Sequence, residues 1–564
     1  MRAGRTIVAV VGLVIGALWP SGIVPAAPAI GTGLVIPAIV SVPRTVTNDQ
    51  FTDVACTTPG NCVAVGELSL APAVQVAVTQ TDTAGVWSPV RAAVFPTGIE
   101  NRNPNDEFTA VSCAVTATCT AVGWFLDAAG NQEAMTMSEA NGVWSPARPA
   151  VFPAGVASAT PNALFTSVSC PAAGGCSAAG QFADAGGHVE AMTATQVNGA
   201  WQAVAPAAFG DAPHGTPNDG FAAIECASVG NCTAAGWFLD QGGHQEAMTE
   251  SLVSGQITPV AAAIIPAGAE NVPADEFTSV SCPSASNCTA AGWFLSASGQ
   301  QRSFIQTETD GQWAQGVPSS VSTNLPSLNQ GFTSISCPSV GNCTAVGWST
   351  VASGNNGAVI WSQSAGQWSG LTTATIPSGA QGVNQNDGFT AVSCSTASSC
   401  MAVGYFVDAS GNRQAMSDRS VNGVWQPVVP ASVLPIVGNP NPYDSFTSVA
   451  CVSLRNCVAA GFFVDATGAN EAMTQRTTSA LTIPLQRLTN ATQATPFRFP
   501  LSIAGVTQVV WSLASGALPK GIALAPHAGL LTGTPLKSGV YRFTLRATYG
   551  DLTATTPVVL RVVA

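Results

Sequence analysis

Alternating apolar and polar positions recur along most of this chain in short runs that predict β-strands. In one copy of the pattern, Phe108–Cys113 (FTAVSC) alternates, and Cys119–Asp127 (CTAVGWFLD) predicts a second strand after a five-residue turn. Glu133–Ser138 predicts a third strand, and the turn-forming pair Asn141-Gly142 leads into a fourth that begins at Val143-Trp144. Each copy therefore predicts one antiparallel sheet of four short strands.

The four-strand pattern repeats eight times, with a period of 55 to 57 residues. Its opening phenylalanines are Phe51, Phe108, Phe165, Phe221, Phe277, Phe332, Phe389 and Phe446. One small sheet cannot bury both of its faces, whereas sheets stacked radially bury each face against the next. We therefore predict an all-β, eight-bladed β-propeller, with an open array of sheets as the alternative. Residues 34–42 resemble an outer strand and could complete the last sheet.

All sixteen cysteines fall into pairs, one pair per repeat, with five residues between the partners. The pairs are Cys56/Cys62, Cys113/Cys119, Cys170/Cys176, Cys226/Cys232, Cys282/Cys288, Cys337/Cys343, Cys394/Cys400 and Cys451/Cys457. An even count in fixed local pairs favours disulfides at the base of each first hairpin. Each bridge closes a small ring, so we expect it to stiffen its own hairpin more than it ties repeats together. Zinc is disfavoured, because zinc sites use two to four intervening residues and the chain has only four histidines to add.

The N-terminus has the pattern of a secretory signal peptide. Arg2 and Arg5 supply the positive end, Ile7–Leu18 the apolar run, and Ala27–Ala29 the small residues before cleavage. We predict a signal peptide at 1–29, the repeat domain at 30–483 and a second domain at 484–564; an uncleaved anchor is the alternative. Since no later run of 18 apolar residues predicts a membrane span, and disulfides persist outside the cytosol, we expect a secreted or cell-surface protein.

Composition excludes one class of partner. The chain has 564 residues, only 9% of them charged, and a formal net charge of −12. Nucleic-acid binding needs clustered Lys and Arg against the phosphates, so we expect no nucleic-acid partner. A disordered chain would be more charged and less apolar, so the composition favours a folded, turn-rich β protein.

The repeat resembles a known family. Ser281–Pro283 followed by Cys288–Trp293, and Ser336–Pro338 followed by Cys343–Trp348, are similar to the "SCP…C-x-AVG" repeats of secreted actinobacterial propeller-like proteins. The similarity covers roughly residues 50 to 480. It implies a propeller-like fold and leaves the activity open.

The C-terminal part resembles another family. Trp511–Leu513, Gly516–Ile522, Gly529–Pro535 and Gly539–Phe543 closely resemble the Ig-like domain of bacterial surface proteins, which is related to cadherin-like sandwiches. The resemblance implies an Ig-like β-sandwich that acts as a spacer or adhesive module. Relatives of this fold often bind calcium, but the acidic calcium motifs are missing here, since Asp551 is the only acid after Glu471.

Several repeated polar and aromatic positions are candidate sites. Acids before the opening Phe could form a cation site or a negative rim, although a turn cap explains them more simply; they are Asp49, Asp106, Asp219, Asp275, Asp387 and Asp444. Aromatic residues after the repeat glycine would suit carbohydrate stacking if exposed, but repetition favours a core role; they are Trp124, Trp237, Trp293, Trp348, Tyr405 and Phe462.

Repeated titratable residues are weaker candidates. One equivalent series could contain paired carboxylates for glycoside hydrolysis: Glu133, Glu190, Glu246 and Glu471. Because they recur by symmetry, whereas a catalytic residue usually departs from it, we predict no catalytic residue among them. His188 and His244 also occupy equivalent sites, where we expect surface turns. We predict no catalytic, cofactor-binding or metal-binding residue.

Departures from the repeat indicate where a ligand could bind. The fifth repeat has Arg302 and Phe304 where others have a Glu-Ala-Met-Thr string, and the sixth has Trp361. We take Arg302, Phe304 and Trp361 as candidate ligand-binding residues, with drift among repeats as the alternative. The predicted function is non-catalytic binding or adhesion to an extracellular glycan or protein. The alternatives are a polysaccharide hydrolase or lyase on the propeller, and a structural cell-envelope protein.

Overall fold

The computed structural model describes residues 32–37, 48–71, 74–99, 104–210, 215–269, 274–319, 329–350, 354–376, 386–431, 439, 442–477, 488–501, 509–549 and 552–564. Every regular element in these ranges is a β-strand, so the all-β prediction is confirmed. The predicted signal peptide lies outside the described residues. Within them, no helix is long and apolar enough to span a bilayer.

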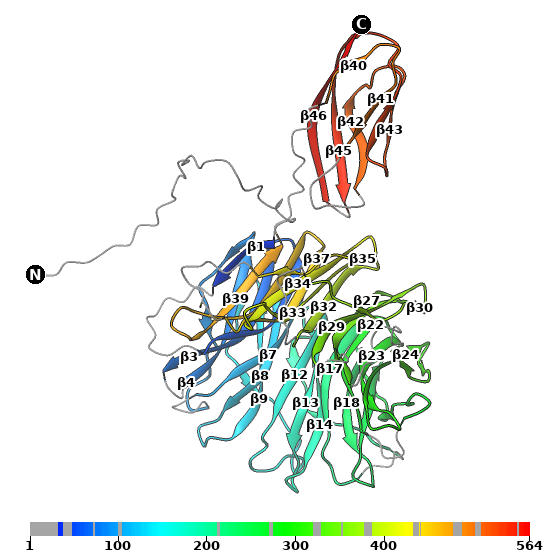
Figure 1. Cartoon of the computed structure of the whole chain (residues 1–564). Helices are drawn as coiled ribbons and strands as arrows, with labels where there is room; N and C mark the ends of the chain where they lie inside the picture. The colour runs from blue at the N-terminus through cyan, green and yellow to red at the C-terminus, as the bar shows by residue number, and fades with distance from the viewer. Residues whose placement is uncertain are drawn as a thin grey trace, which may run out of the picture.

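Each of the eight repeats forms one antiparallel sheet, and we number these sheets 1 to 8 in chain order (Figure 1). The first strands are β2 (Gln50–Thr58), β7 (Glu107–Val115), β12 (Leu164–Ala172), β17 (Gly220–Ser228), β22 (Asp275–Ser284), β27 (Gln330–Ser339), β32 (Gly388–Thr396) and β37 (Ser445–Ser453). The second strands are β3 (Asn61–Ala71), β8 (Thr118–Leu126), β13 (Gly175–Ala183), β18 (Asn231–Leu239), β23 (Asn287–Leu295), β28 (Asn342–Thr350), β33 (Ser399–Val407) and β38 (Asn456–Val464). The third strands are β4 (Val74–Thr83), β9 (Gln132–Ala140), β14 (Val189–Val197), β19 (Gln245–Val253), β24 (Gln301–Thr309), β29 (Asn356–Ser364), β34 (Arg413–Val421) and β39 (Asn470–Thr477).

The predicted fourth strand is split into two short pieces that both pair with the third strand. These pieces are β5 (Val86–Trp87) and β6 (Arg91–Ala92), β10 (Val143–Trp144) and β11 (Arg148–Pro149), β15 (Ala200–Trp201) and β16 (Ala205–Pro206), β20 (Gln256–Ile257) and β21 (Ala261–Ala262), β25 (Gln312–Trp313) and β26 (Val317–Pro318), β30 (Gln367–Trp368) and β31 (Thr372–Thr373), and β35 (Val424–Trp425) and β36 (Val429–Pro430). In sheet 8 the fourth strand is β1 (Thr32–Pro37), which lies beside β39 as the sequence predicts (Figure 1).

All eight predicted disulfides are present, one in each sheet, and all sixteen cysteines are paired. The bridges are Cys56–Cys62, Cys113–Cys119, Cys170–Cys176, Cys226–Cys232, Cys282–Cys288, Cys337–Cys343, Cys394–Cys400 and Cys451–Cys457. In sheet 4 the partners lie directly opposite each other on the first and second strands. Across the eight bridges the Cα atoms are 3.9 to 4.1 Å apart, within reach of one S–S bond. No bridge links one repeat to another.

Each bridge closes a ring within its own hairpin, as expected, and the disulfide cysteines on the second strands also pack against a neighbouring sheet. Cys176, Cys400 and Cys457 are 4%, 2% and 0% exposed. Each packs with apolar residues of the preceding sheet: Cys176 with those of sheet 2, Cys400 with those of sheet 6, and Cys457 with those of sheet 7. The bridges are therefore also part of the core between sheets, because the small ring places one sulfur of each pair on the face that the preceding sheet covers.

Hydrogen-bonding groups lie close to the same sulfur atoms. Cys176 Sγ is 3.4 Å from Thr120 Oγ1 of sheet 2, and Cys400 Sγ is 3.7 Å from Thr344 Oγ1 of sheet 6. A disulfide sulfur carries no hydrogen, so the threonine hydroxyl is the donor in both contacts. Cys457 Sγ instead lies 3.3 Å from the carbonyl oxygen of Ser453 in its own hairpin. These cysteines are structural residues, and their burial leaves no sulfur surface for a ligand.

The glycine of the repeated "AVG" string is required by a close approach of two strands. At Gly123, an added Cβ would lie 2.0 Å from the carbonyl oxygen of Glu107 and 2.8 Å from the Cα of Phe108. The first strand has a β-bulge at this point, between Phe108 and Ala110, and a bulge bends the strand toward its partner. The equivalent glycines of the other seven sheets meet the same backbone atoms.

Neighbouring sheets are joined by a repeated hydrogen bond from the threonine at this bulge. Thr52 Oγ1 donates to the carbonyl oxygen of Phe108 at 2.5 Å, and Thr109 Oγ1 donates to that of Phe165 at 2.6 Å. Between sheets 8 and 1, Thr447 Oγ1 donates to the carbonyl oxygen of Phe51 at 2.7 Å. Threonines at the same position make this bond at seven of the eight junctions. At the junction of sheets 4 and 5, where the residue is Ala222, the backbone N–H of Cys282 donates to Glu225 Oε2 at 3.2 Å instead.

The apolar core is divided among the junctions between sheets. At the junction of sheets 1 and 2, Val63 and Val65 pack with Phe108, Phe125 and Met135. At the junction of sheets 8 and 1, the core contains Phe51, Val54, Val78, Val458 and Ala460. Each sheet thus buries apolar side chains on both faces, which one small sheet cannot do alone.

The C-terminal residues form two further sheets. One has the strand order β40 (Ala491–Thr492), β46 (Leu552–Val563), β45 (Gly539–Tyr549), β42 (Val510–Gly516); the other has the order β41 (Phe497–Pro500), β44 (Leu530–Gly533), β43 (Ile522–Ala525). Trp511, Leu531, Leu545 and Leu560 are buried in one core, each at most 1% exposed. This two-sheet core is what an Ig-like sandwich requires. The predicted boundary at 483/484 lies outside the described residues and stays a prediction.

Candidate functional site

One buried position of the third strand differs in size from sheet to sheet. Its residues all pair with an alanine of the second strand, as Ala194 pairs with Ala178. In sheets 1 to 8 they are Gln80, Met137, Ala194, Glu250, Gln306, Trp361, Asp418 and Gln475. Sheet 3 therefore has the smallest side chain at a position that other sheets fill with a long one.

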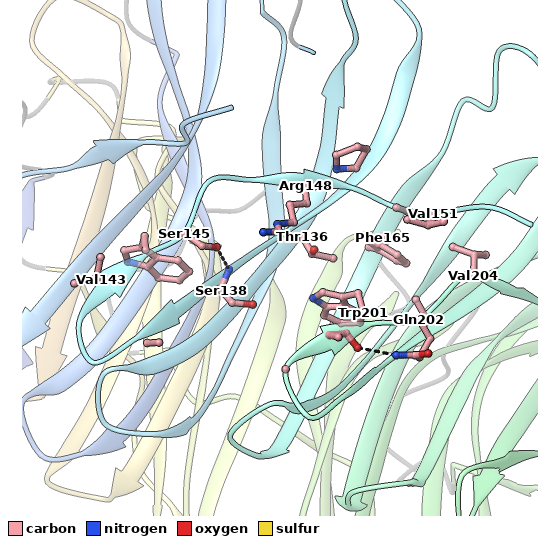
Figure 2. Close-up of a pocket in the computed structure, with 17 residues that line it drawn as sticks. Thr136, Ser138, Val143, Ser145, Arg148, Val151, Phe165, Trp201, Gln202 and Val204 are labelled. Atoms are coloured by element: carbon pink, nitrogen blue, oxygen red, sulfur yellow. Dashed lines mark hydrogen bonds between the residues drawn. The ribbon is translucent and has the colours of Figure 1, made fainter. Parts of the chain in front are cut away.

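A cavity of about 600 Å³ lies beside Ala194, between sheets 2 and 3 (Figure 2). Sheet 2 contributes Thr136, Ser138 and Arg148, and sheet 3 contributes Ala194 and Trp201. This volume falls in the range of small-molecule sites in proteins. The cavity is a departure from the repeat and was not found from the sequence, although the alanine in an otherwise long-chain position was a usable signal.

Sheet 6 shows what fills the equivalent space elsewhere. There Trp361 takes the place of Ala194, and its ring lies 4.5 Å from that of Trp368, the equivalent of Trp201. The Trp361 ring also stacks on Phe332 at 5.8 Å. In sheet 3 the Trp201 ring stacks on Phe165 at 6.4 Å, and the space that a second indole would occupy is open.

The cavity combines aromatic surface with polar groups. Trp201 and Phe165 lie close together in Figure 2, with Thr136 and Arg148 above Trp201 and Gln202 beside it. Ser145 accepts a hydrogen bond from the backbone N–H of Ser138 at 3.3 Å. Among the described residues, the indole N–H groups of Trp144 and Trp201 have no hydrogen-bond acceptor. Aromatic rings with hydroxyl, amide and guanidinium groups suit a ligand that has both apolar and polar faces.

A smaller cleft of about 200 Å³ lies between sheets 1 and 2. It is lined by the charged residues Asp82, Arg91 and Glu139. Burial raises the pKa of Glu139, and the positive charge of Arg91 opposes that rise. Asp82 forms an ion pair with Arg476 of sheet 8. The charges of this cleft are therefore balanced within the protein.

Two carboxyl groups meet at another point of the junction between sheets 1 and 2. Glu67 occupies the position that is aromatic or Gln in the other sheets, and it accepts hydrogen bonds from Gln50 at 3.0 Å and from Gln75. Burial, together with the smaller effect of the charge of Glu107, raises the pKa of Glu67 to about 7. Burial also raises the pKa of Glu107, which accepts a hydrogen bond from Trp124. This pair was not predicted from the sequence, although Glu67 breaks the aromatic series.

The structure places the candidate ligand-binding residues inside the repeat domain. Phe304 is fully buried and stacks on Phe277 at 5.1 Å, and Trp361 is 1% exposed and donates its indole N–H to the carbonyl oxygen of Ser369 at 2.7 Å. These two side chains are packing residues with no surface for a ligand, which corrects the expectation. Arg302 is half-buried, and the structure does not bring it to the cavity at Ala194.

The acids before the opening Phe are buried hydrogen-bond acceptors and do not form an exposed rim. Asp106 accepts from the backbone N–H of Leu126 at 3.1 Å, and Asp219 from that of Ala191 at 2.6 Å. His188 and His244 lie in turns, where their Nδ1 atoms are 3.3 and 3.1 Å from carboxylate oxygens of Asp184 and Asp240.

The remaining candidate series are half-buried, both the aromatic residues after the repeat glycine and Glu133, Glu190, Glu246 and Glu471. Burial raises the pKa of Glu133 to about 7. Over the described part of the chain, no three His, Cys, Asp or Glu side chains cluster closely enough to hold a metal ion.

Sequence comparison identifies the C-terminal part of the chain. A family model described as "Putative Ig domain" matches residues 479–563, in agreement with the predicted Ig-like domain. No curated protein matches the chain in sequence.

Similarity to solved structures is low. Two of the similar structures are proteins from Bacteroides fragilis, each described as a "putative alpha-galactosidase". Each shares 26% identity with this chain over 14% of its length, with a TM-score of 0.14, and the chain spans 17% of the length of each of these two proteins. A Trypanosoma rangeli sialidase shares 10% identity over 78% of this chain and 57% of its own, with a TM-score of 0.33. A polysaccharide lyase described as an ulvan lyase shares 9% identity over 69% of this chain and 93% of its own, with a TM-score of 0.36. At these TM-scores the similarities carry no information on the activity of this chain.

Proposed function

We propose that this chain is an extracellular glycan-binding protein. In this proposal residues 30–483 form a closed, eight-bladed β-propeller and residues 484–564 an Ig-like spacer or adhesive module. The closed ring is supported by the bond from Thr447 to Phe51 and by the pairing of β1 with β39. A secreted or cell-surface location is supported by the eight disulfides, because reducing conditions in the cytosol would keep such cysteines as thiols.

The observation that carries the proposal is the cavity at Ala194. It departs from the repeat, it has the volume of a ligand site, and it offers the Trp201 ring together with Ser, Thr, Gln and Arg side chains. A sugar presents C–H groups on its faces and hydroxyls at its edges, so it can stack on an indole while it hydrogen-bonds to the polar groups. The cavity thus suits a segment of a polysaccharide chain.

Pull-down on insoluble polysaccharides and cell walls tests the proposal. The test compares residues 30–564 with an Ala194→Trp variant, in which the new indole fills the cavity as Trp361 does in sheet 6. Gln306→Trp is the matched control, because it places the same side chain at the equivalent position of sheet 5. We expect retention on at least one glycan, a loss of about tenfold or more in Ala194→Trp, and no change in Gln306→Trp. The site would be refuted if the glycan retains Ala194→Trp as strongly as the wild-type protein and the variant melts at the wild-type temperature.

A second candidate function is a polysaccharide hydrolase or lyase, and the Glu67–Glu107 pair favours it. Glycoside hydrolysis uses two carboxyl groups, one of them with a raised pKa that lets it act as an acid near neutral pH. The pKa of Glu67, raised to about 7, suits the acid, and Glu107 would be the second carboxyl group. Release of reducing or unsaturated sugars from a retained glycan, abolished by Glu67→Gln, would support this function. If the protein retains a glycan and the glycan stays intact, only the binding function is supported.

A further inference from the structure

Two arginines occupy equivalent positions in sheets 1 and 2. Arg91 on β6 pairs with Thr79 of the third strand, and Arg148 on β11 pairs with Thr136, the residue equivalent to Thr79. Both arginines are exposed, and each lines the space between its own sheet and the next. Arg91 therefore serves as an internal reference for Arg148.

Arg91 has an acidic partner on the next sheet. Glu139 lines the same cleft, and the two charges interact, since Arg91 opposes the effect of burial on this carboxyl group. Glu139 pairs with Trp144 in sheet 2, and the residue that pairs with Trp201 in the same way in sheet 3 is Gln196. The position that carries a carboxylate in sheet 2 thus carries a neutral amide in sheet 3.

Arg148 is the one charged residue among the 17 that line the cavity at Ala194. It forms no ion pair with any residue that the structure describes, whereas Asp82 is paired with Arg476 and Glu139 faces Arg91 in the neighbouring cleft. Figure 2 shows its side chain above Thr136 and Trp201. The cavity therefore presents an unbalanced positive charge beside an aromatic ring.

We propose that the ligand of this cavity is an acidic polysaccharide whose uronic acid residues pair with Arg148. The inference rests on the proposed glycan-binding function and names the class of glycan. A guanidinium matches a carboxylate with two parallel hydrogen bonds, and Trp201 stacks on the face of the same or the adjacent sugar. The formal net charge of −12 disfavours non-specific attraction of a polyanion, so retention of an acidic glycan reports a local site.

Binding to polygalacturonate and to its methyl ester tests the charge requirement, because the two polymers share one backbone. With residues 30–564 we expect polygalacturonate to bind at least tenfold more tightly than the ester. Arg148→Gln should remove that difference, and Gln196→Glu should reduce it by placing a carboxylate at the position equivalent to that of Glu139. Arg91→Gln is the matched control and should bind as the wild type does. Thermal melting of each variant reports whether it is folded.

The outcomes separate this inference from the proposed function. Equal binding of the acid and the ester, or an Arg148→Gln variant that still prefers the acid, would overturn the charge inference and leave glycan binding standing. Retention on no glycan at all would overturn both. A dextran sulfate arm distinguishes carboxylate recognition from general anion binding: stronger retention on the sulfated polymer than on polygalacturonate contradicts the uronic acid assignment.

Discussion

The hydroxyl of Thr447 donates a hydrogen bond of 2.7 Å to the carbonyl oxygen of Phe51, 396 positions away in the chain. The same bond joins sheets 1 and 2, where Thr52 donates to Phe108. A second bond supports the junction of sheets 8 and 1, because Ser448 Oγ donates to Asp53 at 2.6 Å. The first and last repeats are therefore joined by the same type of contact as two consecutive repeats.

Removal of the Thr447 hydroxyl should destabilise the repeat domain. Thr447→Val leaves the Phe51 carbonyl without this donor, and we expect a loss of about 1 kcal/mol in the free energy of unfolding by urea. Thr333→Val is the control, because Thr333 makes the equivalent bond to Phe389 at 2.8 Å within the chain. A cost at Thr333 with none at Thr447 would show that the last and first sheets do not meet in solution.

Removal of one disulfide should weaken the protein without changing the others. Replacement of both Cys282 and Cys288 by Ser opens one hairpin ring, and chain entropy predicts a loss of up to about 2 kcal/mol. Urea unfolding measures the loss, and peptide mapping without reductant should still find the seven other pairs within their own repeats. Any bridge between two repeats would contradict the pairing.

The side-chain carboxyl group of Glu67 should lower the free energy of unfolding as pH rises. Its pKa is about 7 in the folded protein and 4.5 in the unfolded chain, so between these values the folded state holds a proton that the unfolded state has lost. This contribution is complete below pH 4.5 and disappears as pH rises through 7. The effect should be about 1 kcal/mol, because solvent screens part of the shift.

Melting temperatures at pH 5 and pH 8 test the role of Glu67. We expect Glu67→Gln to lose less stability than the wild type over this interval, because its amide carries no charge to bury. Equal losses in the two proteins would place the titrating group elsewhere. Glu133→Gln is a useful comparison, since burial also raises the pKa of Glu133 to about 7.

The close approach at Gly123 should tolerate no side chain. Gly123→Ala places a Cβ 2.0 Å from the Glu107 carbonyl oxygen, so the two strands must separate, and we expect a loss of about 3 kcal/mol. Gly357→Ala is the control, because that glycine lies in β29 with no atom closer than 4.0 Å to the added Cβ. We expect its stability to change by less than about 1 kcal/mol. Similar melting temperatures for the two variants would contradict the packing described here.

The local elements could be predicted because short segments carry their signals. Alternation, turn pairs such as Asn141-Gly142, and cysteines six positions apart depend on neighbours within one hairpin. The positive φ of 52° at Asn141 and the pairing of Cys113 with Cys119 match those signals. The Ig-like domain was likewise predicted, from strings such as Gly529–Pro535, and the match to residues 479–563 supports it.

The same local signals did not predict which residues surround each disulfide. The spacing of Cys170 and Cys176 predicts their bond, but it does not say which sheet covers the bond. Thr120, which lies 3.4 Å from Cys176 Sγ, belongs to the preceding repeat. A contact of this kind depends on how two sheets stack, so only the structure could show it.

The candidate site could not be predicted from local patterns either. Phe304 and Trp361 break the repeat, but their sheets bury them, so a departure in sequence did not become an exposed group. Ala194 also breaks the repeat, and its effect depends on what the next sheet brings opposite it. A missing side chain has a consequence only where packed neighbours leave the space open.

The sequence by itself determined the repeat, the strands, the disulfide partners and the Ig-like domain, because each follows from residues near one another in the chain. Only the tertiary structure decided which side chains face one another across sheets. It joined Thr447 to Phe51, set Glu67 within reach of the charge of Glu107, and left Arg148 at an open cavity. Such contacts depend on the stacking of sheets whose equivalent residues lie 55 or more positions apart in sequence, and no local pattern encodes the geometry of that stacking.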